Sequence, residues 1–293
     1  MEELLEKLKG KLPSTPLLLF SAALLLLILS ICLALAANRS QPEPEAEASL
    51  SAETPSADPS PPAPAQPALL VTAEQMSKLS YEDSVLGPLS WDLSEESLKE
   101  LNQTLIRYGI LDSEEICHFL AQATVETGAG RALTEAGDEE YFRKRGYTTG
   151  TRGAGYLHLT HDYGQMAFAT WMLKSNVPAL AEIRYVSPVS NGREDIAAAY
   201  YTALQTAANL GLNISRYSRI VYDSNSTLAT GADYIAEQFA WESAGYYWKV
   251  TGIGEALTEG NTDAASQLVG GSNWQSRREA YAAFRSVLTD TAG

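Results

Sequence analysis

The feature that most constrains this chain is a run of 21 residues without a charge, over residues 17–37. About 20 apolar residues are enough to cross the hydrocarbon core of a bilayer as one helix. Three lysines precede the run, so the positive-inside rule places residues 1–16 in the cytoplasm and the rest of the chain outside the cell. We therefore predict a single-pass anchor in the cell membrane over residues 17–37, with an extracellular remainder.

A cleaved signal peptide is the alternative interpretation of the same run. Ala34-Leu35-Ala36 has the small-x-small pattern of a signal-peptidase site, and cleavage there would make the protein secreted. Signal peptides usually have apolar regions of about 7–15 residues, so the length of this run favours a retained anchor. Residues 38–68 are rich in Pro, Ala, Ser and Glu, which predicts a disordered linker, followed by a globular domain over residues 69–293.

Composition excludes several classes of function. The net charge is −15 and the sequence pI is about 4.6, with no basic patch, which argues against a nucleic-acid partner. The two cysteines lie in the apolar run and in a predicted helix, so we expect no disulfide between them. Three histidines and two separated cysteines give no metal-binding spacing. We expect neither a metal nor a cofactor.

Helical patterns dominate the predicted domain, and long alternating strand patterns are absent. In residues 94–108, Leu98, Leu101 and Leu105 form one stripe, and Ser94 is a suitable N-cap. Further helices are predicted over 114–124, with Ser113 as the cap, and over 197–210, 231–248, 261–269 and 275–288. The sequence therefore predicts a mostly α-helical single domain with glycine-rich loops at 128–155, 251–254 and 270–271.

Glu126 is the first candidate catalytic residue. Ile116, Phe119 and Ala123 recur on the face of a helix that packs into the core, and Glu126 lies at the edge of that face. Gly128 ends the helix, so Glu126 is also at the negative end of the helix dipole. Both surroundings disfavour the ionised carboxylate, and a general acid in glycoside cleavage must keep its proton. An ordinary solvated glutamate is the alternative.

A second carboxylate follows nine residues later. Glu135 lies beyond a glycine-containing turn, in a polar loop that can fold back towards the end of the helix. A carboxylate in such a loop stays ionised and can activate water, so the two glutamates suit an acid and a base role. Asp138, Glu139 and Glu140 are nearby competitors, and surface charge is the default interpretation for each.

Residues 153–163, GAGYLHLTHDY, combine glycines, aromatic rings and short polar side chains. This composition is typical of a saccharide groove. The two histidines of this segment more often have a structural role when no metal partner or nucleophile is in view. The aromatic residues of 239–248 have helical spacing and are expected mainly in the core.

Together these motifs resemble glycoside hydrolase family nineteen, which includes chitinases and phage-endolysin lysozymes. Residues 118–128, HFLAQATVETG, look like the family's FLAQ-x-x-HE-[ST]-G helix, and 153–163 look like its GRG-x-IQLT-x-x-x-Y strip. Residues 239–248 resemble its F-E-[ST]-A-x-x-F-W helix, and 268–278 resemble its INGG-x-N…R ending. The resemblance covers about residues 95–288, with the motifs in the family's order.

The resemblance implies a lysozyme-like helical fold with a substrate groove between two lobes. It implies hydrolysis of β-1,4 bonds beside N-acetylated sugars, with inversion and without a cofactor. Glu126 would be the general acid and Glu135 the general base. Residues implied to bind the substrate or the attacking water are Gln122, His158, Thr160, Tyr163 and Asn273.

Four positions depart from the family motifs. Val125 replaces a histidine, Ala154 an arginine, His158 a glutamine and Val269 an asparagine. Because both glutamates remain, we interpret these changes as altered subsite preference. Peptidoglycan is favoured as the polysaccharide partner, since a short membrane tether suits a substrate in the adjacent cell wall. A chitinase, and an inactive protein that binds the wall or acts as a scaffold, remain the alternatives.

Overall fold

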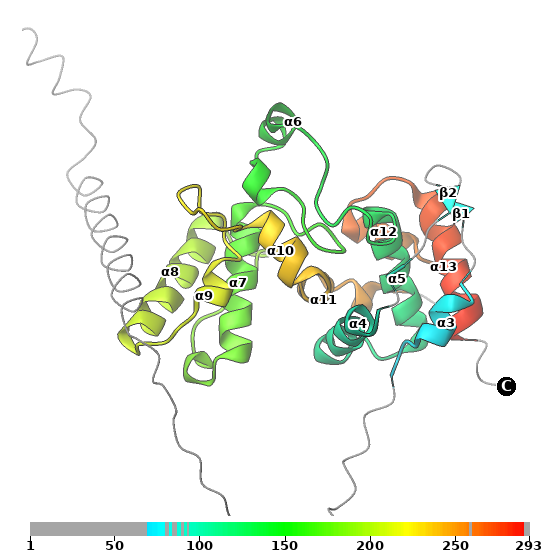
Figure 1. Ribbon diagram of the computed structural model, residues 1–293, viewed down its shortest axis with the longest axis horizontal. Helices are drawn as coiled ribbons and strands as arrows, with labels where there is room; N and C mark the ends of the chain where they lie inside the picture. Colours follow the sequence, from blue (N-terminus) through cyan, green and yellow to red (C-terminus); the bar gives the residue numbers. More distant parts are fainter. Residues whose placement is uncertain are drawn as a thin grey trace, which may run out of the picture. The chain divides into compact units, whose positions relative to one another are not determined.

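The computed structural model describes residues 69–79, 82–83, 87–88, 91–92, 94–257 and 260–289 (Figure 1). The predicted cytoplasmic segment 1–16, anchor 17–37 and linker 38–68 lie outside the described residues. Within the described ranges, no helix combines the length and the apolar character needed to cross a bilayer. Residues 66–293 form one compact unit.

The described part of the chain is mostly helical, as the sequence predicts. Its α-helices are α3 (Ala73–Ser77), α4 (Glu95–Tyr108), α5 (Ser113–Thr127), α6 (Glu139–Lys144), α7 (Asp162–Asn176), α8 (Arg193–Asn209), α9 (Ser215–Ser218), α10 (Ala232–Gln238), α11 (Ala240–Val250), α12 (Asp263–Val269) and α13 (Trp274–Leu288). Short 3-10 turns are η2 (Thr149–Thr151), η3 (Pro178–Leu180) and η4 (Gly254–Ala256), and the strands β1 (Glu82–Asp83) and β2 (Gly87–Pro88) pair antiparallel.

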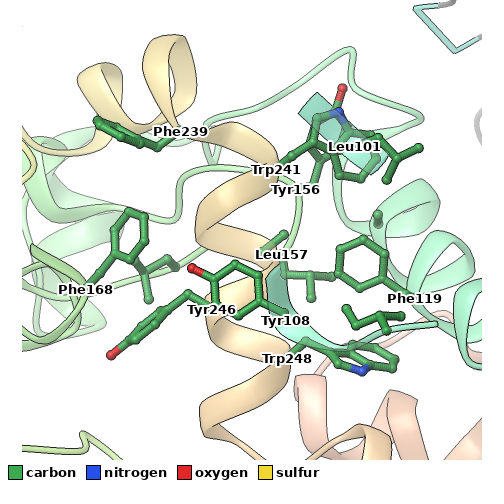
Figure 2. Packing of buried hydrophobic residues seen from close by; sticks show 14 of the residues in the cluster. Leu101, Tyr108, Phe119, Tyr156, Leu157, Phe168, Phe239, Trp241, Tyr246 and Trp248 are labelled. Atoms are coloured by element: carbon green, nitrogen blue, oxygen red, sulfur yellow. The ribbon is translucent and has the colours of Figure 1, made fainter. Parts of the chain in front are cut away.

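Helix α11 joins two groups of helices (Figure 1). On one side α4 packs on α11 and α5 lies along α13, while on the other α7 packs on α8. Tyr246 of α11 contacts Phe168 and Trp171 of α7, with ring centroids 5.1 and 5.9 Å apart. Trp248, on the same helix, meets Phe119 of α5 edge-on at 5.3 Å (Figure 2). The main apolar core is therefore continuous through α11.

Helix ends follow local capping chemistry, with two differences from the sequence prediction. Ser94 caps α4 as predicted, and its hydroxyl accepts a hydrogen bond from the Ser97 amide at 3.3 Å. Helix α5 is capped by Asp112, not by the predicted Ser113, because the Asp112 carboxylate accepts two backbone amides. The predicted helix over 231–248 is two helices, interrupted at Phe239, where φ is −146°.

The chain enters the described fold at a side-chain clamp. Asn102 of α4 is buried, and its amide oxygen accepts the Val71 backbone N–H at 3.0 Å. Its amide nitrogen donates to the Val71 carbonyl at 2.8 Å and to the Leu98 carbonyl at 2.8 Å. One side chain thus satisfies both backbone groups of Val71, which is fully buried beside it.

Candidate active site

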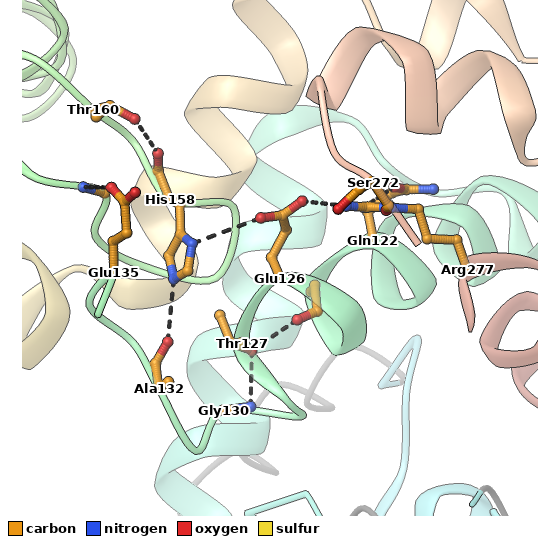
Figure 3. Close-up of polar contacts among 12 residues, drawn as sticks. Gln122, Glu126, Thr127, Gly130, Ala132, Glu135, His158, Thr160, Ser272 and Arg277 are labelled. Atoms are coloured by element: carbon orange, nitrogen blue, oxygen red, sulfur yellow. Dashed lines mark hydrogen bonds and ion pairs between the residues drawn. The ribbon is translucent and has the colours of Figure 1, made fainter. Parts of the chain in front are cut away.

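Glu126 lies in the last turn of α5, where the chain reverses. Gly128 ends the helix in the left-handed conformation, with φ 59°. The Thr127 hydroxyl donates to the Ala123 carbonyl at 2.7 Å and accepts from the Gly130 amide at 2.9 Å (Figure 3). These contacts fix the turn that follows Glu126 and hold its carboxylate in a defined position.

The surroundings of Glu126 are more polar than its helical periodicity predicts. Its side chain is 17% exposed, and Oε1 accepts a hydrogen bond from Arg277 Nη2 of α13. Its other oxygen, Oε2, lies 3.6 Å from His158 Nδ1 (Figure 3). The apolar face of α5 is present, but a guanidinium and an imidazole reach its edge from distant parts of the sequence.

Arg277 is held by a buried polar network. Its side chain is 2% exposed, and it donates to Gln122 Oε1 and, at 3.1 Å, to the Ser272 carbonyl. Gln122 is completely buried, and its amide nitrogen donates to Thr262 at 3.0 Å and to Ser266 at 3.1 Å. The sequence analysis assigned Gln122 to sugar contact, whereas the structure places it behind Arg277, away from the surface.

The loop before α13 packs closely against the Glu126–Arg277 pair. A Cβ atom on Gly271 would overlap Arg277 Nη2 and would come within 2.8 Å of Glu126 Oε1. Only a glycine therefore fits here with the pair in place. Asn273, predicted to bind substrate, is two residues further on, where it precedes α13 with φ 60° and an exposed side chain.

Glu135 is held by three donors. Its Oε1 accepts from the Tyr141 hydroxyl at 3.0 Å, and the Tyr147 hydroxyl donates at 2.8 Å to Oε1 and 2.9 Å to Oε2. The Gly153 amide donates to Oε2 at 3.2 Å. Burial, and then the hydrogen bond to Glu135, raise the pKa of the Tyr147 hydroxyl. Neither tyrosine was predicted from the sequence, because α6, which carries Tyr141, is only six residues long and Tyr147 lies in the loop after it, so neither segment has a periodicity that reveals side-chain direction.

A small ladder of backbone pairs brings the Glu135 loop to the 153–163 segment. Ala154 forms isolated antiparallel bridges with Thr134 and Leu159. The Glu135 amide donates to the Gly153 carbonyl at 2.8 Å. The sequence analysis expected only a glycine-rich loop here, because each paired stretch is too short for an alternating pattern.

His158 occupies the space between the two glutamates (Figure 3). Its backbone lies in the left-handed region, with φ 48°, and its Nε2 is 3.2 Å from the Ala132 carbonyl oxygen. Gly153 makes room for it, since a Cβ there would be 2.8 Å from the His158 Cβ and 3.3 Å from the Glu135 Cβ. Backbone of this rare kind persists where surrounding contacts hold it, and it clusters at functional sites.

The other two predicted residues of this segment lie in different settings. The Thr160 hydroxyl donates to the His158 carbonyl at 2.7 Å, and the side chain is half-buried. Tyr163 stacks on His161, with ring centroids 4.9 Å apart. Burial, followed by the charge of Glu126 and then Tyr163, raises the pKa of Tyr247. Tyr247 of α11 therefore lies near the candidate site, although the sequence analysis assigned its helix mainly to the core.

A cavity of about 480 Å³ lies elsewhere in the fold. It is bounded by residues of α4, α7, α9, α10 and α11, including Arg107, Arg216 and Glu242, and neither Glu126 nor Glu135 lines it. Among the described residues, no three His, Cys, Asp or Glu side chains gather closely enough to hold a metal ion. The groups of the candidate site that can transfer a proton include its two carboxylates, its imidazole and its tyrosine hydroxyls.

Comparisons of the chain with protein-family models, curated proteins and solved structures give no match. The family resemblance consequently rests on the motifs in the sequence itself.

Proposed function

We propose that this protein is a glycoside hydrolase that cuts β-1,4 bonds in N-acetylated amino-sugar polymers, with cell-wall peptidoglycan as its substrate. One observation carries the proposal: Glu126 and Glu135, from separate segments, lie on either side of His158 (Figure 3). Glycosidases use such pairs of carboxylic residues on the two sides of the scissile bond. The membrane anchor over residues 17–37 would keep the enzyme at the cell surface, beside the wall.

The two carboxylates have different partners, which suits different roles. Arg277 occupies Oε1 of Glu126, so the proton for the leaving oxygen is delivered from Oε2. Glu135 is oriented by Tyr141 and Tyr147 and acts as the base that activates water. An inverting enzyme separates its carboxyl groups by about 6.5–9.5 Å to admit that water. Thr160, beside His158, helps to hold the water.

The arrangement of helices supports a lysozyme-like fold with two lobes. The α4–α5–α13 group and the α7–α8 group would be the lobes, joined by α11, with the substrate groove passing over Glu126. Sugar contacts are assigned to His158, Tyr163 and Asn273, whereas Gln122 is reassigned to the support of Arg277.

An inactive wall-binding protein is the second candidate, and the bonding of Glu135 favours it. Both oxygens of Glu135 already accept hydrogen bonds, from two tyrosine hydroxyls and one backbone amide. A water molecule that is to be activated must therefore displace a tyrosine hydroxyl or use a remaining lone pair. In this candidate the fold binds glycan strands without cleaving them.

Turbidity of purified cell walls separates the two candidates. We expect clearing by the wild type and a loss of about 100- to 10,000-fold in Glu126→Gln and Glu135→Gln, the usual contribution of a positioned acid or base. Glu139→Gln is the matched control, since Glu139 is exposed in the first turn of α6. Activity retained in Glu126→Gln would contradict the mechanism. A wild type that clears no walls but cleaves soluble chitin oligomers would be a chitinase, and inactivity on both would favour the binding protein.

A further inference from the structure

The imidazole of His158 has a defined orientation. Its Nε2 lies 3.2 Å from the Ala132 carbonyl oxygen, and a carbonyl oxygen can only accept a hydrogen bond. Nε2 therefore carries a hydrogen. In a neutral ring the other nitrogen, Nδ1, would then present a lone pair.

That second nitrogen faces Glu126. Nδ1 is 3.6 Å from Glu126 Oε2, while Arg277 holds Oε1. A bare Nδ1 opposite an ionised carboxylate would place two lone pairs against each other. The contact becomes attractive when one proton lies on either partner. Arg277 already donates to Oε1, so we place the resting proton on Nδ1 of His158, from where it can be donated to Oε2.

We propose that His158 is a positioning residue that supplies Glu126 with the proton used in each cleavage. The proposal rests on the glycosidase function above. The proton on His158 Nδ1 passes to Oε2 of Glu126, and Glu126 gives it to the leaving glycosidic oxygen. His158, whose side chain is 18% exposed, then takes a proton from solvent. Glu135 releases to solvent the proton that it removed from the attacking water, so the cycle is balanced.

Other charged or titratable groups face this pair from three directions. Arg277 comes from α13, Tyr247 from α11 and Glu135 from the loop paired with residues 153–154. Burial and the charge of Glu126 raise the pKa of Tyr247, so its hydroxyl remains protonated at neutral pH. These groups are common to the wild type and to His158→Gln, so a difference in pH dependence between the two reports on the imidazole.

The first test compares the pH dependence of kcat/KM on cell-wall fragments. His158→Gln keeps a hydrogen-bonding side chain but cannot carry the proton. We expect the alkaline limb of its profile to move to lower pH, because the limb then reports deprotonation of Glu126 alone and no longer the loss of the proton shared by His158 and Glu126. Glu139→Gln should keep the wild-type limb. An alkaline limb that stays in place in His158→Gln would overturn the proposal, even if its rate falls.

The second test needs no activity. Nitrogen NMR of ¹⁵N-histidine protein resolves three histidines, and the protonation of each ring nitrogen can be followed. At one fixed pH near neutrality, we expect Nδ1 of His158 to carry a proton in the wild type. In Glu126→Gln the new amide can donate to Nδ1, which should then be bare. Equal protonation of Nδ1 in both proteins would overturn the proposal that His158 and Glu126 share a proton. An inactive wild type would overturn only the glycosidase function on which the proposal rests.

Discussion

Replacement of Arg277 by methionine tests the buried network behind the candidate acid. Methionine has a similar length and no donors, so Gln122, Glu126 and Ser272 each lose a hydrogen bond. Gln122 is completely buried, and an orphaned buried acceptor costs about 1–3 kcal/mol. Removing one partner of a buried ion pair costs about 3–5 kcal/mol. Glu126 is 17% exposed and can regain water, so we expect the free energy of unfolding to fall by about 3 kcal/mol, the lower end of that range.

The assay is urea unfolding followed by tryptophan fluorescence, with a parallel thermal melt. A loss of about 3 kcal/mol corresponds to a fall in Tm of about 6–12 °C for a domain of this size. Arg278→Met is the matched control. Arg278 is the next residue of α13, is exposed, and pairs with Asp263 at 2.6 and 2.8 Å, so its loss should have a much smaller effect.

The same Arg277→Met replacement in a Gln122→Met protein shows how much of the lost stability comes from Gln122. In a Gln122→Met protein the buried acceptor is already gone, so Arg277→Met should cost at least about 1 kcal/mol less than in the wild type. A loss below about 1 kcal/mol for Arg277→Met in the wild type would refute the assigned network. An equal cost in both backgrounds would refute the role given to Gln122.

Three further predictions address other parts of the chain. Burial lowers the pKa of His118, which stacks on Tyr281, so the folded protein holds this imidazole neutral. The free energy of unfolding should therefore fall as the pH drops below about 6.5, where the unfolded chain binds a proton. In urea unfolding, His118→Phe should show a weaker dependence of stability on pH in this range. Burial raises the pKa of Cys117 to about 12, so iodoacetamide should leave its thiol unmodified in the native protein and alkylate it after unfolding, as read by mass spectrometry. Deletion of residues 1–68 should leave the Tm unchanged; a large decrease would mean that this segment packs on the domain.

Local sequence signals predicted the helix ends well because their causes are local. Ser94 and Gly128 lie at the ends of α4 and α5, where an oxygen acceptor and a left-handed residue are needed. Helix α7 was not predicted, and burial explains why. Nearly all of its residues from Gly164 to Leu173 are buried, so it lacks the polar face that reveals a helix in sequence.

The candidate site was only partly predictable for the same kind of reason. Glu126 was identified from its place at the end of an apolar helix, which depends on residues nearby in sequence. Arg277 lies 151 residues away, and no pattern within one segment shows that it reaches the same carboxylate. Gln122 lies four residues before Glu126 on the same helix face, but it was predicted to contact sugar and its support of Arg277 was not predicted. His158 was assigned to sugar contact through the family resemblance alone, and its contact with Glu126 depends on the ladder around Gly153.

The clamp at Asn102 determines where mechanical force enters the protein. If the N-terminal end is fixed while the domain grips a glycan strand, tension passes along the chain to Val71. There the two hydrogen bonds to Asn102 transmit the load to the middle of α4. Helix α4 packs on α11, while Glu126 lies on α5, so the helix that first takes the load carries neither candidate carboxylate. The clamp and the two candidate catalytic carboxylates thus lie in different segments of the fold.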